Sequence, residues 1–318
     1  MGFLDKILLF SLIAHEDRSK NQFLCTLFSG SMVYTTVLVL SVLLLGYVLI
    51  CVFYYLLQER LLFVPDDGHS DTFREKVSCA HEDVFLDGEA GAKLHALWLN
   101  AKNARGAMLY FHGNTGTVDR WALIAEEFVR SGFDVLLPDY RGYGKSVGHR
   151  NEELLYSDAL AWYRELEKKR EGVKLCVYGR SLGSGLATWL CSRVKPQALV
   201  LETPFNALAD VARFHSAFIP VKALLKYSFD NTSHLAKARC SVLIAHGDKD
   251  KVVPYRLGKQ LYEEVKEEVD CEMLSVPGGE HHNLSEFPAF RNALNQFFDR
   301  HFPSAEADTK LVEGSEDV

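Results

Sequence analysis

The sequence has no excess of positive charge. Its 318 residues include 35 Lys and Arg against 42 Asp and Glu, which gives a formal net charge of -7 at pH 7. Binding to a polyanion normally requires a basic patch or stripe, so nucleic acid is not an expected partner. The chain also lacks a C-x-x-C pair, an H-E-x-x-H motif and a phosphate-binding glycine loop followed by Lys. We therefore expect neither a metal centre nor a nucleotide site, and the chemistry predicted below requires no cofactor.

Charged residues are absent between Lys20 and Glu59, and residues 33–57 within this gap are almost wholly apolar. As a helix this run would be about 37 Å long, which exceeds the hydrocarbon core of a bilayer, about 30 Å. A cleaved signal peptide is the main alternative, but its apolar region usually spans about 7–15 residues and ends in small residues. We therefore expect a single-pass transmembrane anchor at residues 33–57, preceded by a short N-terminal tail over residues 1–32.

The side of the membrane that would hold the rest of the chain stays open. Basic residues lie on both sides of the anchor in equal number, so the positive-inside rule does not decide the orientation. Cysteine is scarce, with seven residues and no paired spacing, which favours reduced thiols and a cytosolic location. A short tail before an uncleaved anchor, in contrast, commonly leaves the following domain outside the cytosol.

Short β-branched runs alternate with amphipathic stretches of helical length after the anchor, which is typical of a mostly parallel sheet with helices on both faces. Eight strands are predicted, at residues 84–86, 94–99, 107–111, 134–138, 174–178, 198–201, 241–245 and 272–276. Five helices are predicted, at residues 118–130, 152–169, 182–192, 254–269 and 285–301. Only residues 87–91 join the first two strands, too few for a crossover helix, so we expect this pair to be antiparallel.

One connection is longer than a crossover requires. About forty residues separate the strand ending at Leu201 from the next strand, and aromatic side chains are frequent among them. Long insertions of this kind are often lids, so we expect a small, mostly helical cap at residues 203–239, near the active site. The chain would then contain one domain at residues 58–301, followed by an acidic, solvated tail at residues 302–318.

Residues 178–183 (YGRSLG) place a G-x-S-x-G motif directly after a predicted strand and at the start of a predicted helix. This is the context of a nucleophile elbow, in which the serine has a strained backbone. Gly179 and Gly183 would be required there, because a Cβ at either position would collide with the neighbouring strand and helix. The alternative is an ordinary glycine-rich turn. We predict that Ser181 is the nucleophile of a serine hydrolase.

A serine nucleophile needs a histidine base and a carboxylate that orients it, in the chain order Ser, Asp or Glu, His. Two acids, Asp248 and Asp250, follow the next-to-last strand, and we prefer Asp250 because it lies farther into the loop. Glu202, at the end of the previous strand, is a third candidate. Adjacent histidines, His281 and His282, follow the last strand, and either could be the base. We prefer His281.

The tetrahedral intermediate of such a reaction needs two backbone N–H donors. One comes from the residue after the nucleophile, here Leu182, and the other from the loop after the third strand. Residues 111–116 (FHGNTG) form that loop, and Gly113 allows it to turn an amide inward, so Asn114 is predicted to supply the second donor. A generic glycine turn is the alternative interpretation.

Several motifs together resemble those of a known family: HGN at 112–114, DYRGYGKS at 139–146, GRSLG at 179–183, HGDKD at 246–250 and GGEH at 278–281. With LLFVP at 61–65 after the anchor, roughly residues 33–300 resemble the membrane-anchored branch of the α/β-hydrolase domain-containing serine hydrolases, the one related to yeast bud-emergence hydrolases. The resemblance implies an α/β-hydrolase fold, with Ser181 as nucleophile, Asp250 as acid and His281 as base. His282 departs from the pattern, since Asn often follows the base in related sequences. The DYRGYGKS block would be either a rigid turn or a substrate contact.

We therefore expect a membrane-anchored serine hydrolase that cleaves an ester or thioester through an acyl-enzyme. Its substrates would be small acyl esters, lipids or lipidated proteins, because such molecules partition where the domain is tethered. Two alternatives stay open. One is a serine peptidase or aminopeptidase-like hydrolase, and the other is a non-catalytic hydrolase-like module that binds a partner at the membrane.

Overall fold

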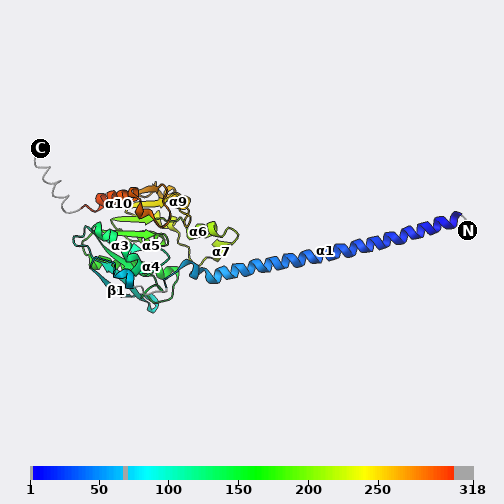
Figure 1. The fold of residues 1–318 in the computed structure, drawn as a ribbon, viewed down its shortest axis with the longest axis horizontal. Coiled ribbons are helices and arrows are strands. Elements are labelled where there is room, and N and C mark those ends of the chain that lie inside the picture. The colour runs from blue at the N-terminus through cyan, green and yellow to red at the C-terminus, as the bar shows by residue number, and fades with distance from the viewer. Residues whose placement is uncertain (1–2, 67–70, 304–318) are drawn as a thin grey trace, which may run out of the picture. The chain divides into compact units, whose positions relative to one another are not determined.

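The computed structural model describes residues 3–66 and 71–303, and the chain divides into two compact units, Met1–Leu57 and Gln58–Val318. The first unit consists of most of helix α1 (Phe3–Leu62) (Figure 1). Within this helix, Ser31–Leu62 contains an 18-residue window with a mean hydropathy of 2.8 and is long enough to cross a membrane. α1 begins well before the predicted anchor because the sequence contains no proline before Pro65. From residue 304 onward, the predicted acidic tail lies outside the described residues.

The second unit contains an eight-stranded sheet with the strand order β1-β2-β4-β3-β5-β6-β7-β8. Its strands are β1 (His81–Asp87), β2 (Lys93–Leu99), β3 (Gly106–Phe111), β4 (Phe133–Pro138), β5 (Leu175–Arg180), β6 (Ala198–Glu202), β7 (Ser241–Gly247) and β8 (Cys271–Val276). β2 pairs antiparallel with both β1 and β4, and all other neighbours are parallel. The predicted mostly parallel sheet and its antiparallel first pair are therefore confirmed.

Helices cover both faces of this sheet (Figure 1). α3 (Val118–Arg130) and α10 (Pro288–His301) pack on one face, in an apolar cluster that includes Phe128 and Phe298. The other face is covered by α4 (Glu152–Lys169), α5 (Gly183–Cys191) and α9 (Tyr255–Val265). Alternate residues of each strand point to opposite faces, so Leu109 joins one cluster and Tyr110 the other.

The ends of the helices follow local capping. α3 and α4 begin and end at the predicted residues, and the Asn151 side chain caps α4 by accepting a hydrogen bond from the Leu154 N–H at 2.8 Å. α10 begins later than predicted because Pro288 occupies its first turn. The residues just before it form a separate 3-10 turn, η2 (Leu284–Glu286). Two further short elements are α2 (Asp71–Arg74) and the 3-10 turn η1 (Glu89–Gly91).

The long insertion between β6 and β7 contains three short helices, α6 (Leu208–His215), α7 (Val221–Leu224) and α8 (Asn231–Leu235), which hold less than half of residues 203–239. The bounds of the cap and its position near the active site stay predictions. Buried Asn231 fixes α8 to α5. Its amide donates to Ser184 Oγ at 2.9 Å, and its oxygen accepts from Thr188 Oγ1 at 2.8 Å. The insertion is thus attached to the helix that follows the predicted nucleophile.

Candidate active site

Ser181 lies in the sharp turn between β5 and α5. Its φ is +51°, a left-handed conformation that non-glycine residues rarely adopt, and such strain typically marks a functional site. Glycine is required on both sides. A Cβ at Gly183 would lie 2.2 Å from the carbonyl oxygen of Phe111, and one at Gly179 would lie 2.6 Å from Ala187 Cβ. The predicted elbow geometry, including the collisions expected at both glycines, is present.

The structure brings His281 to this serine. His281 follows β8 and is 5% exposed, with its Nε2 at 3.0 Å from Ser181 Oγ. Its Nδ1 lies 2.7 Å from Oδ2 of Asp250. An ionised carboxylate can only accept hydrogen bonds, so the network assigns the proton to Nδ1 and leaves the lone pair of Nε2 facing the serine hydroxyl. This is the tautomer that a general base requires.

His282 is exposed and contacts His281 edge-to-face, with 4.8 Å between the ring centroids. Partial burial lowers the pKa of His282, and the neighbouring His281 and Arg180 lower it further. The hydrogen bonds to Ser181 and Asp250 are therefore made by the histidine that the sequence favoured, and the second histidine lies beside it.

Asp250 is held rigidly in the loop after β7. Its Oδ1 accepts hydrogen bonds from the amides of Val252 and Val253, each at 2.8 Å. Its Oδ2 accepts from His281 and lies 3.2 Å from Nε2 of buried His246. Burial raises the pKa of Asp250, but the hydrogen bonds from His246 and His281 outweigh it and hold the pKa below its usual range. The carboxylate is therefore charged at neutral pH and orients the imidazole.

The two other acids have different partners. Asp248 is exposed, and its Oδ1 accepts a hydrogen bond from the Gly278 amide at 2.8 Å, which joins the loops after β7 and β8. Glu202 is buried, accepts from the Tyr178 hydroxyl at 2.5 Å and lies 3.4 Å from Nε of Arg180. Among the described residues, no histidine is hydrogen-bonded to the side chain of either acid.

Arg180 is a part of this site that the sequence did not reveal. It occupies the variable position of G-x-S-x-G, is 5% exposed, and donates to the carbonyl oxygen of His281 at 3.3 Å. Its guanidinium also lies 5.1 Å from the centroid of the Trp121 ring. Arg180 thus holds the loop that carries the imidazole of His281. The sequence could not predict this role, because it depends on which loops meet in space.

The predicted oxyanion donors come from two different connections. Leu182 stands at the N-terminal end of α5, and Asn114 lies in the loop between β3 and α3. Within the part of the chain that the structure describes, neither backbone N–H has a hydrogen-bond partner. An oxyanion hole requires two unpartnered amides before substrate binds, so the assignment of Asn114 and Leu182 stays a prediction.

The DYRGYGKS block, residues 139–146, forms a rigid turn. The Tyr140 and Tyr143 hydroxyls donate to the carbonyl oxygens of His112 and Asn114, at 2.5 and 2.6 Å. Arg141 is fully buried and makes two hydrogen bonds to Asp158. These side chains are buried against protein groups, as expected for a rigid turn. The two tyrosines support the loop that carries Asn114.

Metal ligands are not clustered in the described ranges, 3–66 and 71–303, which contain no group of three or more His, Cys, Asp or Glu that could hold an ion. Six cysteines whose side chains the structure describes are free thiols: Cys51, Cys79, Cys176, Cys191, Cys240 and Cys271.

The site has three parts: a serine in a strand–turn–helix elbow, a histidine after the last strand and an acid after the strand before it. Together they define the class of α/β proteins with a hydrolase-type site. Residues 102–230 match a family model described as Hydrolase_4, serine aminopeptidase S33. An uncharacterized protein of Mycobacterium tuberculosis (strain H37Rv) is 32% identical over 209 residues, which cover 64% of this chain and 74% of that protein. The chain belongs to the α/β-hydrolase superfamily of serine hydrolases.

Two other similar proteins have names that state an activity. The lysophosphatidylserine lipase ABHD12 of Gallus gallus is 32% identical over 203 residues, and the match covers 52% of each protein. Among solved structures, the esterase Pf2001 of Pyrococcus furiosus gives a TM-score of 0.62 at 20% identity, covering 76% of this chain and 98% of the esterase. This structural similarity confirms the α/β-hydrolase fold. The assignment to the bud-emergence branch stays a prediction.

Proposed function

We propose that this protein is a membrane-anchored serine hydrolase that cleaves an ester or thioester, with Ser181, His281 and Asp250 as its catalytic triad. The observation that carries the proposal is the continuous hydrogen-bonded chain from Ser181 Oγ through His281 to Asp250, at 3.0 and 2.7 Å. It begins at a serine whose backbone is held in a left-handed conformation. Such strain persists only when the surrounding structure enforces it.

The proposed reaction proceeds in two steps. His281 Nε2 accepts the proton of Ser181 Oγ as the oxygen attacks the carbonyl carbon of the substrate. The negative charge on the carbonyl oxygen is stabilised by the N–H groups of Asn114 and Leu182. His281 then gives its proton to the leaving alcohol or thiol, and the acyl-enzyme remains. Water, deprotonated by His281, attacks that acyl-enzyme and releases the acid.

The substrate class is inferred from similarity and from the apolar helix. The chain resembles lysophosphatidylserine lipases over about half of its length and of theirs, and resembles an esterase in fold. The apolar stretch Ser31–Leu62 would hold the enzyme at a bilayer, where acylated molecules concentrate. We infer that lipid esters or acylated proteins are the substrates, and that residues 58–301 form the hydrolase domain with its cap at 203–239.

A serine peptidase is the second candidate function, because the matching family model is described as a serine aminopeptidase. The same triad and oxyanion hole would serve both reactions, and the leaving group distinguishes them. A panel of acyl esters of graded length, acyl thioesters and aminoacyl amides separates the two functions. Ester or thioester turnover at least tenfold faster than amide turnover supports the proposal, and the reverse order favours the peptidase.

Covalent labelling tests the nucleophile. A fluorophosphonate probe should label the wild-type chain, and Ser181→Ala should abolish labelling, because the probe reacts only with an activated serine. His281→Ala should reduce turnover by about 10²–10⁴-fold through loss of the general base. His282→Ala is the matched control and should retain most of the activity. Labelling that persists in Ser181→Ala, or loss of activity only in His282→Ala, would contradict the assignment.

A further inference from the structure

The first residues of the second unit, residues 58–64, are held by two other parts of that unit. Gln58, in the last turn of α1, donates from Nε2 to the carbonyl oxygen of Leu224 at 3.0 Å, and its Oε1 accepts from the Lys226 amide at 2.8 Å. The Lys226 ammonium also lies 3.5 Å from a carboxylate oxygen of Glu59. The first of these parts is therefore the cap, in the region of α7.

Phe63 anchors the same segment in the core. Its side chain is 3% exposed and makes edge-to-face contacts with the rings of Tyr227 and Tyr143, at centroid distances of 5.1 and 6.4 Å. The guanidinium of Arg150 lies 4.5 Å from the centroid of the Phe63 ring. Aromatic burial of this kind makes a large contribution to stability, so it holds the backbone at residue 63 in place.

Val64 continues from Phe63 to the loop that carries the predicted oxyanion donor. Its N–H donates to the carbonyl oxygen of Asn114 at 2.9 Å, and its own carbonyl accepts from the Gly116 amide at 3.2 Å. Val64 thus forms an isolated parallel bridge with Thr115. The carbonyl oxygen of Asn114 also accepts from the Tyr143 hydroxyl at 2.6 Å, so it has two donors from distant parts of the sequence.

These contacts fix the orientation of the Asn114 amide. Each peptide group is planar, so two planes meet at the Cα of Asn114. The first contains the Gly113 carbonyl and the Asn114 N–H, and Nδ1 of buried His112 lies 2.6 Å from that carbonyl oxygen. The second contains the Asn114 carbonyl, which Val64 and Tyr143 hold. With both planes held by hydrogen bonds, the direction of the Asn114 N–H is determined.

We propose that Val64 and Tyr143 are positioning residues for the oxyanion hole, so that the segment joining the apolar helix to the hydrolase unit is part of the catalytic scaffold. This proposal rests on the proposed function, since it requires Asn114 to donate to a reacting carbonyl. The Val64 side chain is 42% exposed, so its backbone N–H carries the effect. Neither residue contacts the reacting atoms.

The test uses the full chain with Val64→Pro, which removes the donor because proline has no N–H. Loss of an oxyanion donor costs about 10²–10³ in kcat, and a displaced donor costs less, so we expect kcat to fall by about tenfold or more. KM should change less than twofold, and the midpoint of the pH–rate profile should stay the same because the triad is intact. The conservative Val64→Ala keeps the N–H and should keep turnover near the wild-type level.

Tyr143→Phe removes the second donor to the same carbonyl and should also lower kcat with little change in KM. If the melting temperature shows that Val64→Pro does not fold, the kcat of Tyr143→Phe tests the positioning role instead. Folded variants that keep wild-type kcat would overturn the positioning role, as would equal losses in Val64→Ala and Val64→Pro. Fluorophosphonate labelling of the wild-type chain separates the two proposals, because its absence would contradict the hydrolase function itself.

Discussion

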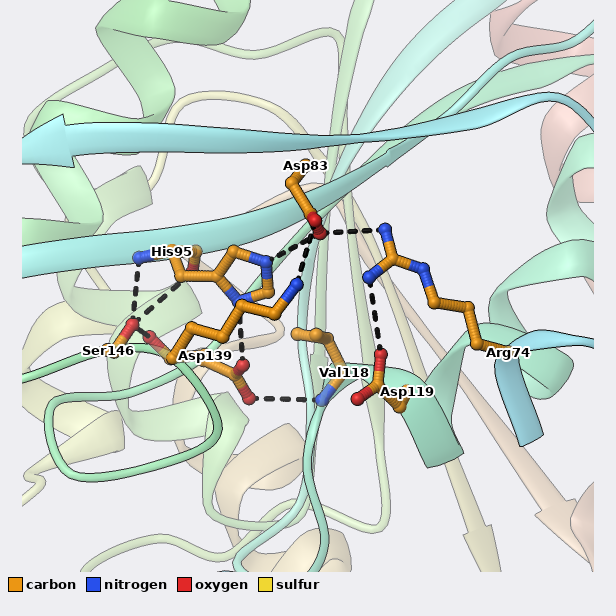
Figure 2. Close-up of polar contacts among 8 residues, drawn as sticks. Arg74, Asp83, His95, Val118, Asp119, Asp139 and Ser146 are labelled. Atoms are coloured by element: carbon orange, nitrogen blue, oxygen red, sulfur yellow. Dashed lines mark hydrogen bonds and ion pairs between the residues drawn. The ribbon is translucent and has the colours of Figure 1, made fainter. Parts of the chain in front are cut away.

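At the scale of single residues, a buried histidine outside the triad links several parts of the sheet edge. His95 is 1% exposed, and its two ring nitrogens lie 3.0 Å from Oδ2 of Asp139 and 2.9 Å from Oδ1 of Asp83 (Figure 2). Asp83 also accepts from Arg74 and Lys145, each at 2.7 Å. One carboxylate on β1 therefore joins α2, β2 and the DYRGYGKS turn.

Asp83 should give the stability of the protein a distinct pH dependence. Burial raises its pKa, but hydrogen bonds from Arg74, Lys145 and His95 outweigh it and hold the pKa well below the ordinary value, about 3.9. A carboxyl with a lowered folded-state pKa stabilises the fold above its unfolded-state pKa, and this contribution is lost as pH falls through the folded-state value. We expect Asp83→Asn to lower the free energy of unfolding by about 1 kcal/mol at pH 7, since Asp83 is partly exposed, and by less at pH 3.

Urea unfolding at pH 7 and pH 3 measures this difference. Asp87→Asn on the same strand is the control, because Asp87 is 81% exposed and its pair with Lys93 lies in solvent. It should change stability by less than about 0.5 kcal/mol at either pH. An equal loss at both pH values in Asp83→Asn would mean that its charge is not what stabilises the fold.

The sequence revealed the residues with local patterns and missed those that depend on strand order. Ser181 could be predicted because its glycines and the strand before it are adjacent in the chain. The choice of Asp250 over Asp248 depended on the shape of one turn, which residue spacing only suggested. The pairing of His95 with Asp139 could not be predicted, because it requires β2 to lie beside β4, a neighbour reached only after two intervening elements.

At the scale of elements, the close approach of α5 to β3 is possible because Gly183 has no side chain. A Cβ at Gly183 would meet the backbone of Phe111, which cannot move without disturbing the sheet. We expect Gly183→Ala to lower the free energy of unfolding by about 3 kcal/mol. Gly172→Ala is the control. It has φ +77° but open space around it, so it should cost only about 1 kcal/mol for the left-handed backbone.

Chemical denaturation of both variants measures this contrast. A Gly183→Ala variant no less stable than Gly172→Ala would show that α5 can shift away from β3 at little cost. The first residue of α5 was predicted one position too early. The sequence placed the start of α5 at Leu182, whereas Leu182 is the N-cap residue and the helix begins at Gly183.

The short cap helices set a limit on prediction from sequence. Their apolar residues indicated a helical insertion, but each helix has only four to eight residues, too few for a periodic pattern. Tertiary contacts, such as those of Asn231 with α5, decide where they begin and end. The contacts of Gln58 and Val64 with distant loops were likewise beyond any local pattern.

At the scale of the whole molecule, the two units should differ in what surrounds them. Changing Leu43, Leu44 and Val48 together to Lys should release the protein from membranes, because each Lys near the centre of a span costs about 3 kcal/mol of insertion free energy. Alkaline carbonate extraction measures the change, with Val at positions 43 and 44 and Leu at 48 as an apolar control. Wild-type protein found in the soluble fraction would contradict the proposed anchor.

The apolar run at residues 33–57 is longer than a typical hydrocarbon core is thick. As a helix it would extend about 37 Å, against a core of about 30 Å. A tilt of about 37° would bring the run back within that thickness, which is near the upper end of the tilts that transmembrane helices adopt, about 40°. The polar residues Gln58, Glu59 and Arg60 follow the run directly, so they would stand at the edge of the hydrocarbon. In a thicker bilayer, about 33 Å, the same run would need a tilt of only about 28°, so the thickness of the membrane would set the tilt of the anchor.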